Sequence, residues 1–214
     1  MSLRPGCTLK NPVARWRVAR LVVICAALLS GPTAAADPAA DMDKAVTAYE
    51  RQEYDTALAI MRPLADQGHT EAQYFMGTFY LYGAGVEMNP GLANVWFRRA
   101  FDQWQTEARQ GKATAMVEVA MMLNTGIGVD RNTPKAIEWL NRAAELNSVE
   151  AWSELGNLYL VGDGVPRDRA AAQGWYQKAA NAGDTHARDM LVWMQRHSDQ
   201  EIDGMLQRAP GAMF

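Results

Sequence analysis

The sequence predicts an all-α protein, a solenoid of antiparallel helix pairs, and three observations support this fold class. The pattern Gly-x-Gly-Val occurs three times in the 214-residue chain, beginning at Gly83, Gly126 and Gly162. After each copy, alanine and tryptophan recur at spacings of three and four residues, which mark one face of a helix. Before each copy stand a column of alanine and a column of glycine or alanine. Columns in register over three copies indicate internal repeats.

The N-terminal segment 1–36 is predicted to be a cleavable secretory signal. Residues 1–20 contain five cations and no acid, residues 21–29 are apolar, and an Ala-x-Ala pattern ends at Ala36. This order of basic, apolar and small residues is typical of a cleaved signal. The apolar run is shorter than the about 20 residues that cross a membrane, although a retained N-terminal anchor is the alternative. We expect a periplasmic or secreted protein, cleaved before Asp37, whose membrane contact is limited to the uncleaved signal.

Removal of this signal changes the composition of the chain. Removing 36 of the 214 residues leaves 178, and the loss of five cations changes the formal net charge from −3 to −8. Such an acidic protein is a poor ligand for nucleic acid and for anionic membrane surfaces. Both cysteines, Cys7 and Cys25, lie in the signal, so the mature chain has neither disulfides nor thiol chemistry.

Residues 37–69 are predicted to form an N-terminal capping helix pair. The two helices are expected over residues 41–52 and 54–67, with Ala57 in the alanine column of the repeats and Gly68 at the end. A solenoid needs such end caps because each end would otherwise expose an apolar repeat face.

Residues 70–183 are predicted to contain three repeats, each a helix pair joined by a Gly-x-Gly loop. The first glycine ends the first helix in a left-handed conformation, and an N-cap four residues after the second glycine begins the second helix. The Ala–Trp–Ala stripe of the second helix faces the groove between repeats, and the small residue of the first helix allows a close helix crossing. The predicted N-caps are Asn89, Asn132 and Asp168. The predicted structural residues are Gly77, Gly83, Gly85, Trp96, Gly126, Gly128, Trp139, Gly156, Gly162, Gly164 and Trp175.

The second helix of the first repeat is predicted to be longer than the others. The alanine columns are 43 residues apart from Ala72 to Ala115 and 36 residues apart from Ala115 to Ala151. The extra residues contain no helix breaker and correspond to about two helical turns, so the helix continues in phase. Trp104 then lies beyond the stack, either as a partner contact or as a lid on the neighbouring repeat.

The C-terminal part is predicted to cap the other end of the solenoid. Residues 184–208 form capping helices, the first of them over 184–197 with the pattern of another first helix. Ser198 and Glu201 are spaced as a capping box that opens a short last helix. Residues 209–214 are expected to form a flexible tail.

The repeat resembles the Sel1-like repeat, a relative of the tetratricopeptide repeat. The resemblance is carried by the series A-x-x-x-x-G-x-x-Y-x-x-G-x-G-V followed by A-x-x-W-x-x-x-A-A. Residues 151–180 match in almost every column and 72–100 match well, whereas 115–144 departs at Ala120 and Leu123. The resemblance implies a right-handed α-solenoid that holds partners, mostly proteins.

The sequence contains no local motif for catalysis, cofactor binding or metal binding. It has no P-loop, no His-Glu-x-x-His and no Gly-x-Ser-x-Gly. The Gly-x-Gly copies are not a dinucleotide-binding fingerprint, because such a fingerprint follows a strand and these copies follow predicted helices. A calcium loop at Asp163 is disfavoured because the equivalent residues of the other two loops are apolar. We therefore predict no catalytic, cofactor or metal residues, although an enzyme remains the alternative because catalytic residues converge in space without local motifs.

The first helices are predicted to line the concave side of the solenoid, a groove suited to partners. Positions 3, 6, 7 and 10 after the first-helix alanines include aromatic side chains and methionine, and Trp152 stands one residue after its alanine; such side chains suit an adaptable protein or peptide site. The alternative is that half of these side chains, such as Phe79 and Leu158, pack between repeats. The predicted partner-binding residues are Phe75, Tyr82, Glu118, Met122, Trp152, Glu154 and Asn157.

Together, the signal, the repeats and the missing catalytic motifs favour an exported scaffold for a protein or peptide partner in the cell envelope. This hypothesis includes no catalytic activity, no cofactor and no nucleic acid. Two alternatives remain open. One is a periplasmic regulator of an envelope sensor or a polysaccharide machine, which rests on analogy with periplasmic Sel1-like proteins. The other is a cell-wall glycan binder or hydrolase, for which only the groove argues.

The predicted signal is tested by sequencing the N-terminus of the protein recovered from the periplasmic fraction. We expect the mature chain to begin at Asp37, because the small residues before it suit the processing peptidase. Recovery of the full 23.6 kDa chain in the membrane fraction would instead establish a retained anchor.

Overall fold

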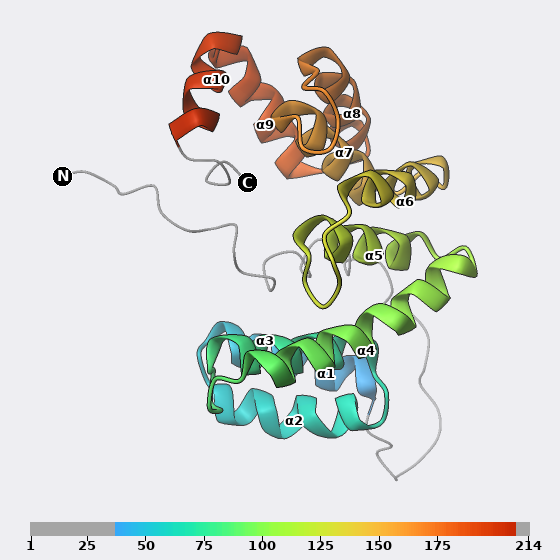
Figure 1. Cartoon of the computed structure of the whole chain (residues 1–214), viewed down its shortest axis with the longest axis vertical. Coiled ribbons are helices and arrows are strands. Elements are labelled where there is room, and N and C mark those ends of the chain that lie inside the picture. The colour runs from blue at the N-terminus through green and yellow to red at the C-terminus, as the bar shows by residue number, and fades with distance from the viewer. Residues whose placement is uncertain (1–36, 209–214) are drawn as a thin grey trace, which may run out of the picture.

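The computed structural model describes residues 37–208, and this part of the chain is helical without any strand. Figure 1 shows helices that follow one another along the long axis of the molecule, from the blue N-terminal end to the red C-terminal end. None of the described helices is both long enough and apolar enough to cross a membrane. The helices are α1 (Pro38–Glu50), α2 (Tyr54–Asp66), α3 (Thr70–Tyr82), α4 (Pro90–Arg109), α5 (Ala113–Thr125), α6 (Thr133–Glu145), α7 (Val149–Val161), α8 (Arg169–Asn181), α9 (Thr185–Arg196) and α10 (Asp199–Arg208).

The predicted fold class, an α-α solenoid, is confirmed. Apart from weaker contacts, each helix from α2 to α8 packs against the helices that precede and follow it in the chain. In a solenoid each repeat contacts only its neighbours, so the stability is a sum of repeat and interface contributions. The predicted signal, residues 1–36, and the predicted tail, residues 209–214, lie outside the described residues.

The first glycine of each loop ends the first helix as predicted. Gly83, Gly126 and Gly162 all lie in the left-handed region, with φ between 67° and 81°. In each case the glycine N–H donates to a carbonyl of the last helical turn, which would otherwise lack a partner. The helix thus stops at the same place in every repeat.

The second glycine of each loop lies against the second helix of the preceding helix pair. A Cβ atom on Gly128 would lie 2.6 Å from Cβ of Phe97 in α4, and one on Gly85 would lie 2.8 Å from Cβ of Tyr54 in α2. Gly164 approaches Thr133 of α6 in the same way. These glycines were predicted to complete a bend, but they also seat each loop on the helix pair before it.

The predicted N-caps of the second helices are confirmed. The side chains of Asn89, Asn132 and Asp168 each accept a hydrogen bond from the backbone N–H three residues later, at 2.9, 3.1 and 2.9 Å. Each cap satisfies one of the first-turn donors that have no partner within the helix. The exit direction of every loop is thereby fixed.

The tryptophan column lies in the grooves between repeats, as predicted. Trp96 and Trp139 are buried, and Trp96 belongs to the core cluster of α1, α2 and α3. Trp175 is half-buried and packs against the cluster formed by α4 to α7. Three residues after each tryptophan a cationic side chain covers the indole ring, at 4.7, 5.0 and 4.3 Å from the centroid. These cations are Arg99, Arg142 and Lys178.

The small residue of each first helix meets the second helix of the same repeat. Gly77 lies under the ring of Phe97, where a Cβ would be 2.6 Å from Cδ1, and Gly156 lies under Tyr176 in the same way. The middle repeat has the larger Ala120 at this position, and there the buried residue equivalent to Phe97 is the smaller Leu140. The same helix crossing is therefore filled in two ways, by an aromatic ring against glycine or by leucine against alanine.

The predicted extension of the second helix in the first repeat is confirmed. Helix α4 has 20 residues, whereas α6 and α8 have 13 each. Trp104 does not project into solvent: its side chain is 5% exposed, and its ring lies 5.6 Å from that of Tyr74 within the α4–α7 cluster. Of the two alternatives, Trp104 is thus a lid on its neighbours, and its role as a partner contact is wrong.

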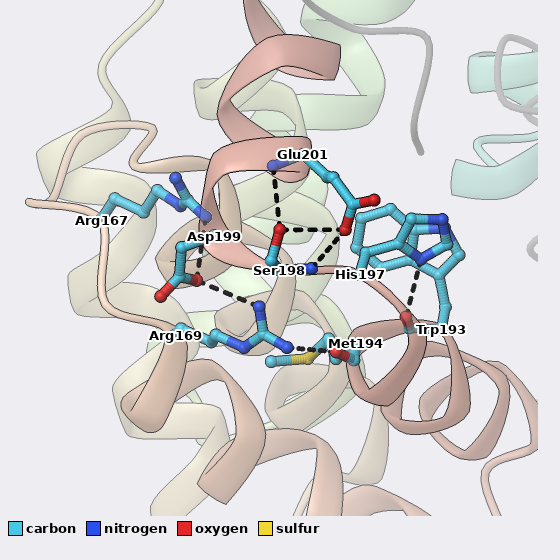
Figure 2. A network of polar contacts seen from close by, with 8 residues as sticks. All are labelled: Arg167, Arg169, Trp193, Met194, His197, Ser198, Asp199 and Glu201. Carbon is cyan, nitrogen blue, oxygen red and sulfur yellow. Dashed lines mark hydrogen bonds and ion pairs between the residues drawn. The ribbon is translucent and has the colours of Figure 1, made fainter.

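The C-terminal cap joins the solenoid through a polar network, which Figure 2 shows. The predicted capping box is present, since the N–H of Ser198 donates to Glu201 Oε2 at 2.7 Å and the N–H of Glu201 donates to Ser198 Oγ at 3.4 Å. The bonds that the N–H and the hydroxyl of Ser198 donate to the Glu201 carboxylate lower the pKa of Glu201. Arg167 and Arg169 both contact Asp199 at the start of α10, and Arg169 also donates to the carbonyl of Met194. Helix α10 is therefore tied to the third repeat.

The crossing of first and second helices predicts a coupled pair of substitutions. Gly77→Ala should destabilise the protein by about 1–3 kcal/mol, because the new methyl group overlaps the Phe97 ring. Adding Phe97→Leu should recover part of this loss, because the double variant has the Ala–Leu pair of the middle repeat. Urea unfolding of the parent, both single variants and the double variant measures the coupling free energy, which we expect to exceed about 0.5 kcal/mol. Strict additivity of the two single changes would show that the two residues do not limit each other.

Candidate functional site

One stripe of side chains runs along the first helices of the three repeats. Its positions stand 3, 6 and 10 residues after each first-helix alanine, and spacings of three and four place them on one side of a helix. The members of this stripe that are exposed or half-buried are here called the first-helix face. The first-helix face comprises Tyr82 of α3, Glu118, Met121 and Thr125 of α5, and Glu154, Asn157 and Val161 of α7.

Four of the seven predicted partner-binding residues lie on this face. Tyr82 is 58% exposed, and Glu118, Glu154 and Asn157 are half-buried. Glu118 and Glu154 occupy equivalent positions, so one carboxylate is repeated in consecutive repeats. These four residues remain candidates for contact with a partner.

Phe75 and Met122 are buried, with 0% and 2% of their surfaces exposed, so the prediction that they face a partner is wrong. Phe75 is covered by Tyr49 of α1, whose ring centroid lies 5.8 Å away. Met122 stands 7 residues after its alanine, a position that is buried in every repeat. Its equivalents Phe79 and Leu158 are buried too, as the alternative interpretation held.

Trp152 is a packing residue in this structure. Its half-buried side chain contacts both the α4–α7 cluster and the C-terminal cluster. It stands one residue after its alanine, which places it about 160° around the helix axis from Glu154 of the same helix. Trp152 therefore lies apart from the first-helix face, and its contact with a partner stays a prediction.

A hydrogen-bonded group that the sequence did not reveal fixes the face in the third repeat. Asn157 Oδ1 accepts a hydrogen bond from Tyr176 Oη at 2.6 Å, and Asn157 Nδ2 lies 3.4 Å from Glu154 Oε2. His186 Nε2 lies 3.4 Å from the same oxygen of Asn157. Burial, and after it the charges of Glu154 and Asp184, raise the pKa of Tyr176, so its hydroxyl stays protonated and donates. Asn157 consequently has a fixed orientation.

Aromatic side chains gather at the other end of the face, around the first repeat. Tyr49 of α1 packs edge-on against Tyr54 at 5.5 Å and against Phe79 at 5.2 Å between ring centroids. Burial and, after it, the neighbouring hydroxyls of Tyr54 and Tyr82 raise the pKa of Tyr49 to about 12. The exposed Tyr82 thus extends a packed aromatic cluster toward solvent. The contribution of α1 was missed because it depends on contacts between separate helices.

Within residues 37–208, no group of three or more His, Asp or Glu side chains is arranged to hold a metal ion. Of the histidines, His186 joins the Asn157 group, and His197 stacks on Trp193 with a centroid separation of 4.6 Å. Both histidine side chains are thus in contact with neighbouring side chains of the protein.

The repeat pattern and the helix-pair geometry now allow the family to be assigned. The family model described as Sel1 repeat matches residues 70–103, 113–148 and 150–184. The chain belongs to the Sel1 repeat family. The predicted resemblance is thus confirmed. The matched segments correspond to the helix pairs α3–α4, α5–α6 and α7–α8, except that the last part of the longer helix α4 lies beyond the first match.

Several relatives in this family are named as regulators. The chain is 25% identical to the exopolysaccharide production negative regulator of Rhizobium meliloti, over 81% of this chain and 82% of that protein. It is 29% identical to the chitin synthase regulator SKT5 of Malassezia restricta, over 67% of this chain but only 10% of that protein. It is 28% identical to chitin synthase regulatory factor 2 of Schizosaccharomyces pombe, over 69% of this chain and 28% of that protein.

Solved structures of Sel1 repeat proteins are also similar to this chain. One is a protective antigen of uropathogenic Escherichia coli with an SLR fold, 28% identical, covering 74% of this chain and 33% of that chain with a TM-score of 0.48. Another is a Sel1 repeat protein from Oxalobacter formigenes, 29% identical, covering 70% and 59% of the two chains with a TM-score of 0.46.

The corrected surface predicts opposite outcomes for two aromatic residues of α3. Phe75→Ala should lower the free energy of unfolding by about 3–5 kcal/mol, because it removes a fully buried ring. Tyr82→Ala should change it by about 0.5 kcal/mol or less, because the side chain is mostly exposed. Thermal and urea unfolding of both variants measures the difference. Equal losses would show that Tyr82 belongs to the core and not to the first-helix face.

Proposed function

We propose that this protein is an exported scaffold that binds a protein partner in the cell envelope through the first-helix face. The observation that carries the proposal is a face repeated over three helix pairs that keeps Tyr82, Glu118, Glu154 and Asn157 accessible while the structural columns are buried beneath it. Solenoids of this kind present extended surfaces to partners. Membership of the Sel1 repeat family supports a role in protein interaction.

In this proposal the protein has no catalytic activity of its own. The most strongly perturbed titratable groups, Tyr49 and Tyr176, are packed within helix contacts, so their pKa shifts have a structural cause. The names of the relatives that describe a role refer to regulation. A regulator needs a surface that recognises its target, which is what the repeated face offers.

A second candidate is a periplasmic regulator that restrains polysaccharide production. The similarity to the exopolysaccharide production negative regulator favours it, because this similarity extends over about four-fifths of both chains. In that case the partner is a component of a polysaccharide machine or of the envelope sensor that controls it. The two candidates share the binding face and differ in what the bound partner does.

Export is supported by the basic, apolar and small-residue order of residues 1–36. A location in the periplasm also agrees with a mature chain without cysteine, which is insensitive to the oxidising conditions there. A cell-wall glycan binder or hydrolase would occupy the same compartment and is separated from a scaffold by the experiment below.

The proposal predicts that the immobilised mature chain, residues 37–214, captures a specific protein from an envelope extract. Tyr82→Ala should reduce the capture by about thirtyfold, as loss of an aromatic anchor costs about 2 kcal/mol of binding. Quantitative mass spectrometry of the eluates measures this ratio. A suitable control is Val95→Ala, which alters an exposed apolar residue of α4 instead of α3.

Purified cell wall serves as the competing ligand in the same assay. Retention of the mature chain on cell wall, with no protein captured, would overturn the scaffold and establish a glycan binder. Gene deletion that raises exopolysaccharide output, together with capture of a polysaccharide-producing component, would establish the regulator.

A further inference from the structure

The charges of the three repeats are segregated between their two sets of helices. The first helices α3, α5 and α7 contain no lysine, arginine or histidine, and all their charged residues are acids. The second helices contain seven cations, three in α4, two in α6 and two in α8, beside four acids. The acids of the first helices are Glu71, Glu118, Glu150 and Glu154. The cations of the second helices are Arg98, Arg99, Arg109, Lys135, Arg142, Arg169 and Lys178.

The two acids on the first-helix face are repeated in register. Glu118 of α5 and Glu154 of α7 both stand three residues after the first-helix alanine, and both are half-buried. Half-burial strengthens the field of a carboxylate relative to a fully solvated one, because less water screens it. Neutral polar residues, Thr125 and Asn157, complete the face beside them. The charged residues of the face are therefore acids, one in each of two consecutive repeats.

The first repeat adds an aromatic end to this acidic face. At the position equivalent to Glu118 it has the buried Phe75, and the exposed group on that helix is Tyr82. The ring of Tyr49 of α1 packs edge-on against Phe75 of the same helix α3, at 5.8 Å between centroids. Aromatic rings and carboxylates are the two kinds of group that bind lysine and arginine, the ring through the alkyl stem or the cation and the carboxylate through the charged head group.

We propose that the first-helix face binds a cationic, extended segment of a partner protein, with lysine or arginine facing Glu118 and Glu154. This inference rests on the proposed function and specifies the chemistry of the partner. A polyanion is repelled by the face, and a neutral glycan gains nothing from the segregation of charge. The cations of α4, α6 and α8 keep the opposite side of the repeats from attracting the same segment.

A labelled peptide of alternating lysine and alanine tests this inference directly, with the mature chain, residues 37–214, as the receptor. Fluorescence anisotropy should show binding that weakens as the ionic strength rises to about 0.15 M, whereas a peptide of alternating glutamate and alanine should not bind. Glu118→Gln combined with Glu154→Gln should weaken the binding by about tenfold, because one exposed ion pair contributes up to about fivefold. Glutamine retains the size of glutamate and one accepting oxygen but removes the charge, and circular dichroism verifies the fold.

The matched control is Glu138→Gln combined with Glu145→Gln, which removes two exposed acids from α6 on the other side. This control should bind the peptide as the parent does. An equal loss in the control, or no loss in the Glu118 and Glu154 variant, would overturn the inference. If a peptide of residues 1–20 binds and the lysine–alanine peptide does not, the inference is overturned too, because the occupant would then be the chain's own basic leader.

Capture from the envelope extract separates this inference from the proposed function. Loss of the captured protein with the Glu118 and Glu154 double variant, but not with the α6 control, supports the inference. Undiminished capture by the double variant overturns the cationic partner while the scaffold function stands. Absence of any captured protein with the parent overturns the proposed function itself.

Discussion

The contact between each Gly-x-Gly loop and the second helix of the preceding helix pair determines where every later element lies. At Gly128 the backbone comes so close to Phe97 that a single methyl group would collide with Cβ of that residue. Gly85 and Gly164 make the same approach on α2 and α6. Because each helix pair packs mainly on its neighbours, a displacement at one loop would move the whole remainder of the stack. The first-helix face is continuous only because three such contacts have the same geometry.

The helix pairs, the caps and the tryptophan stripe could be predicted from the sequence because they depend on local periodicity. Asn89 caps α4 through an amide three residues away, and Trp139 shares its stripe with residues of its own helix. The burial of Phe75 and Met122 could not be predicted in this way. Phe75 is covered by α1, an element about 25 residues earlier, and Met122 lies at the edge of the stripe where helices meet. Burial across helices depends on the crossing geometry, which no single column records.

The group around Asn157 shows the same limit for the candidate site. Its hydrogen-bond partners Tyr176 and His186 are 19 and 29 residues away and belong to different helices. Tyr176 was absent from the predicted columns, although its ring fills the crossing over Gly156 and its hydroxyl orients Asn157. One side chain thus serves the core and the face together. In the first repeat Phe97 fills the same crossing without a hydroxyl, so only the third repeat has this polar support.

Different positions along the first helices have different roles, some in helix packing and some at the accessible surface. Positions 0, 5 and 7 after the alanine face other helices and accept only small or apolar residues, as Ala151, Gly156 and Leu158 illustrate. Positions 3, 6 and 10 retain solvent access in α5 and α7, and there they hold two acids, one amide, one hydroxyl and the apolar Met121 and Val161. Substitutions at the second set change the charge of the surface without changing the crossings beneath it. The residues that set the superhelix are therefore different from those of the proposed binding face, so the charge of that face can change while the helix crossings stay the same.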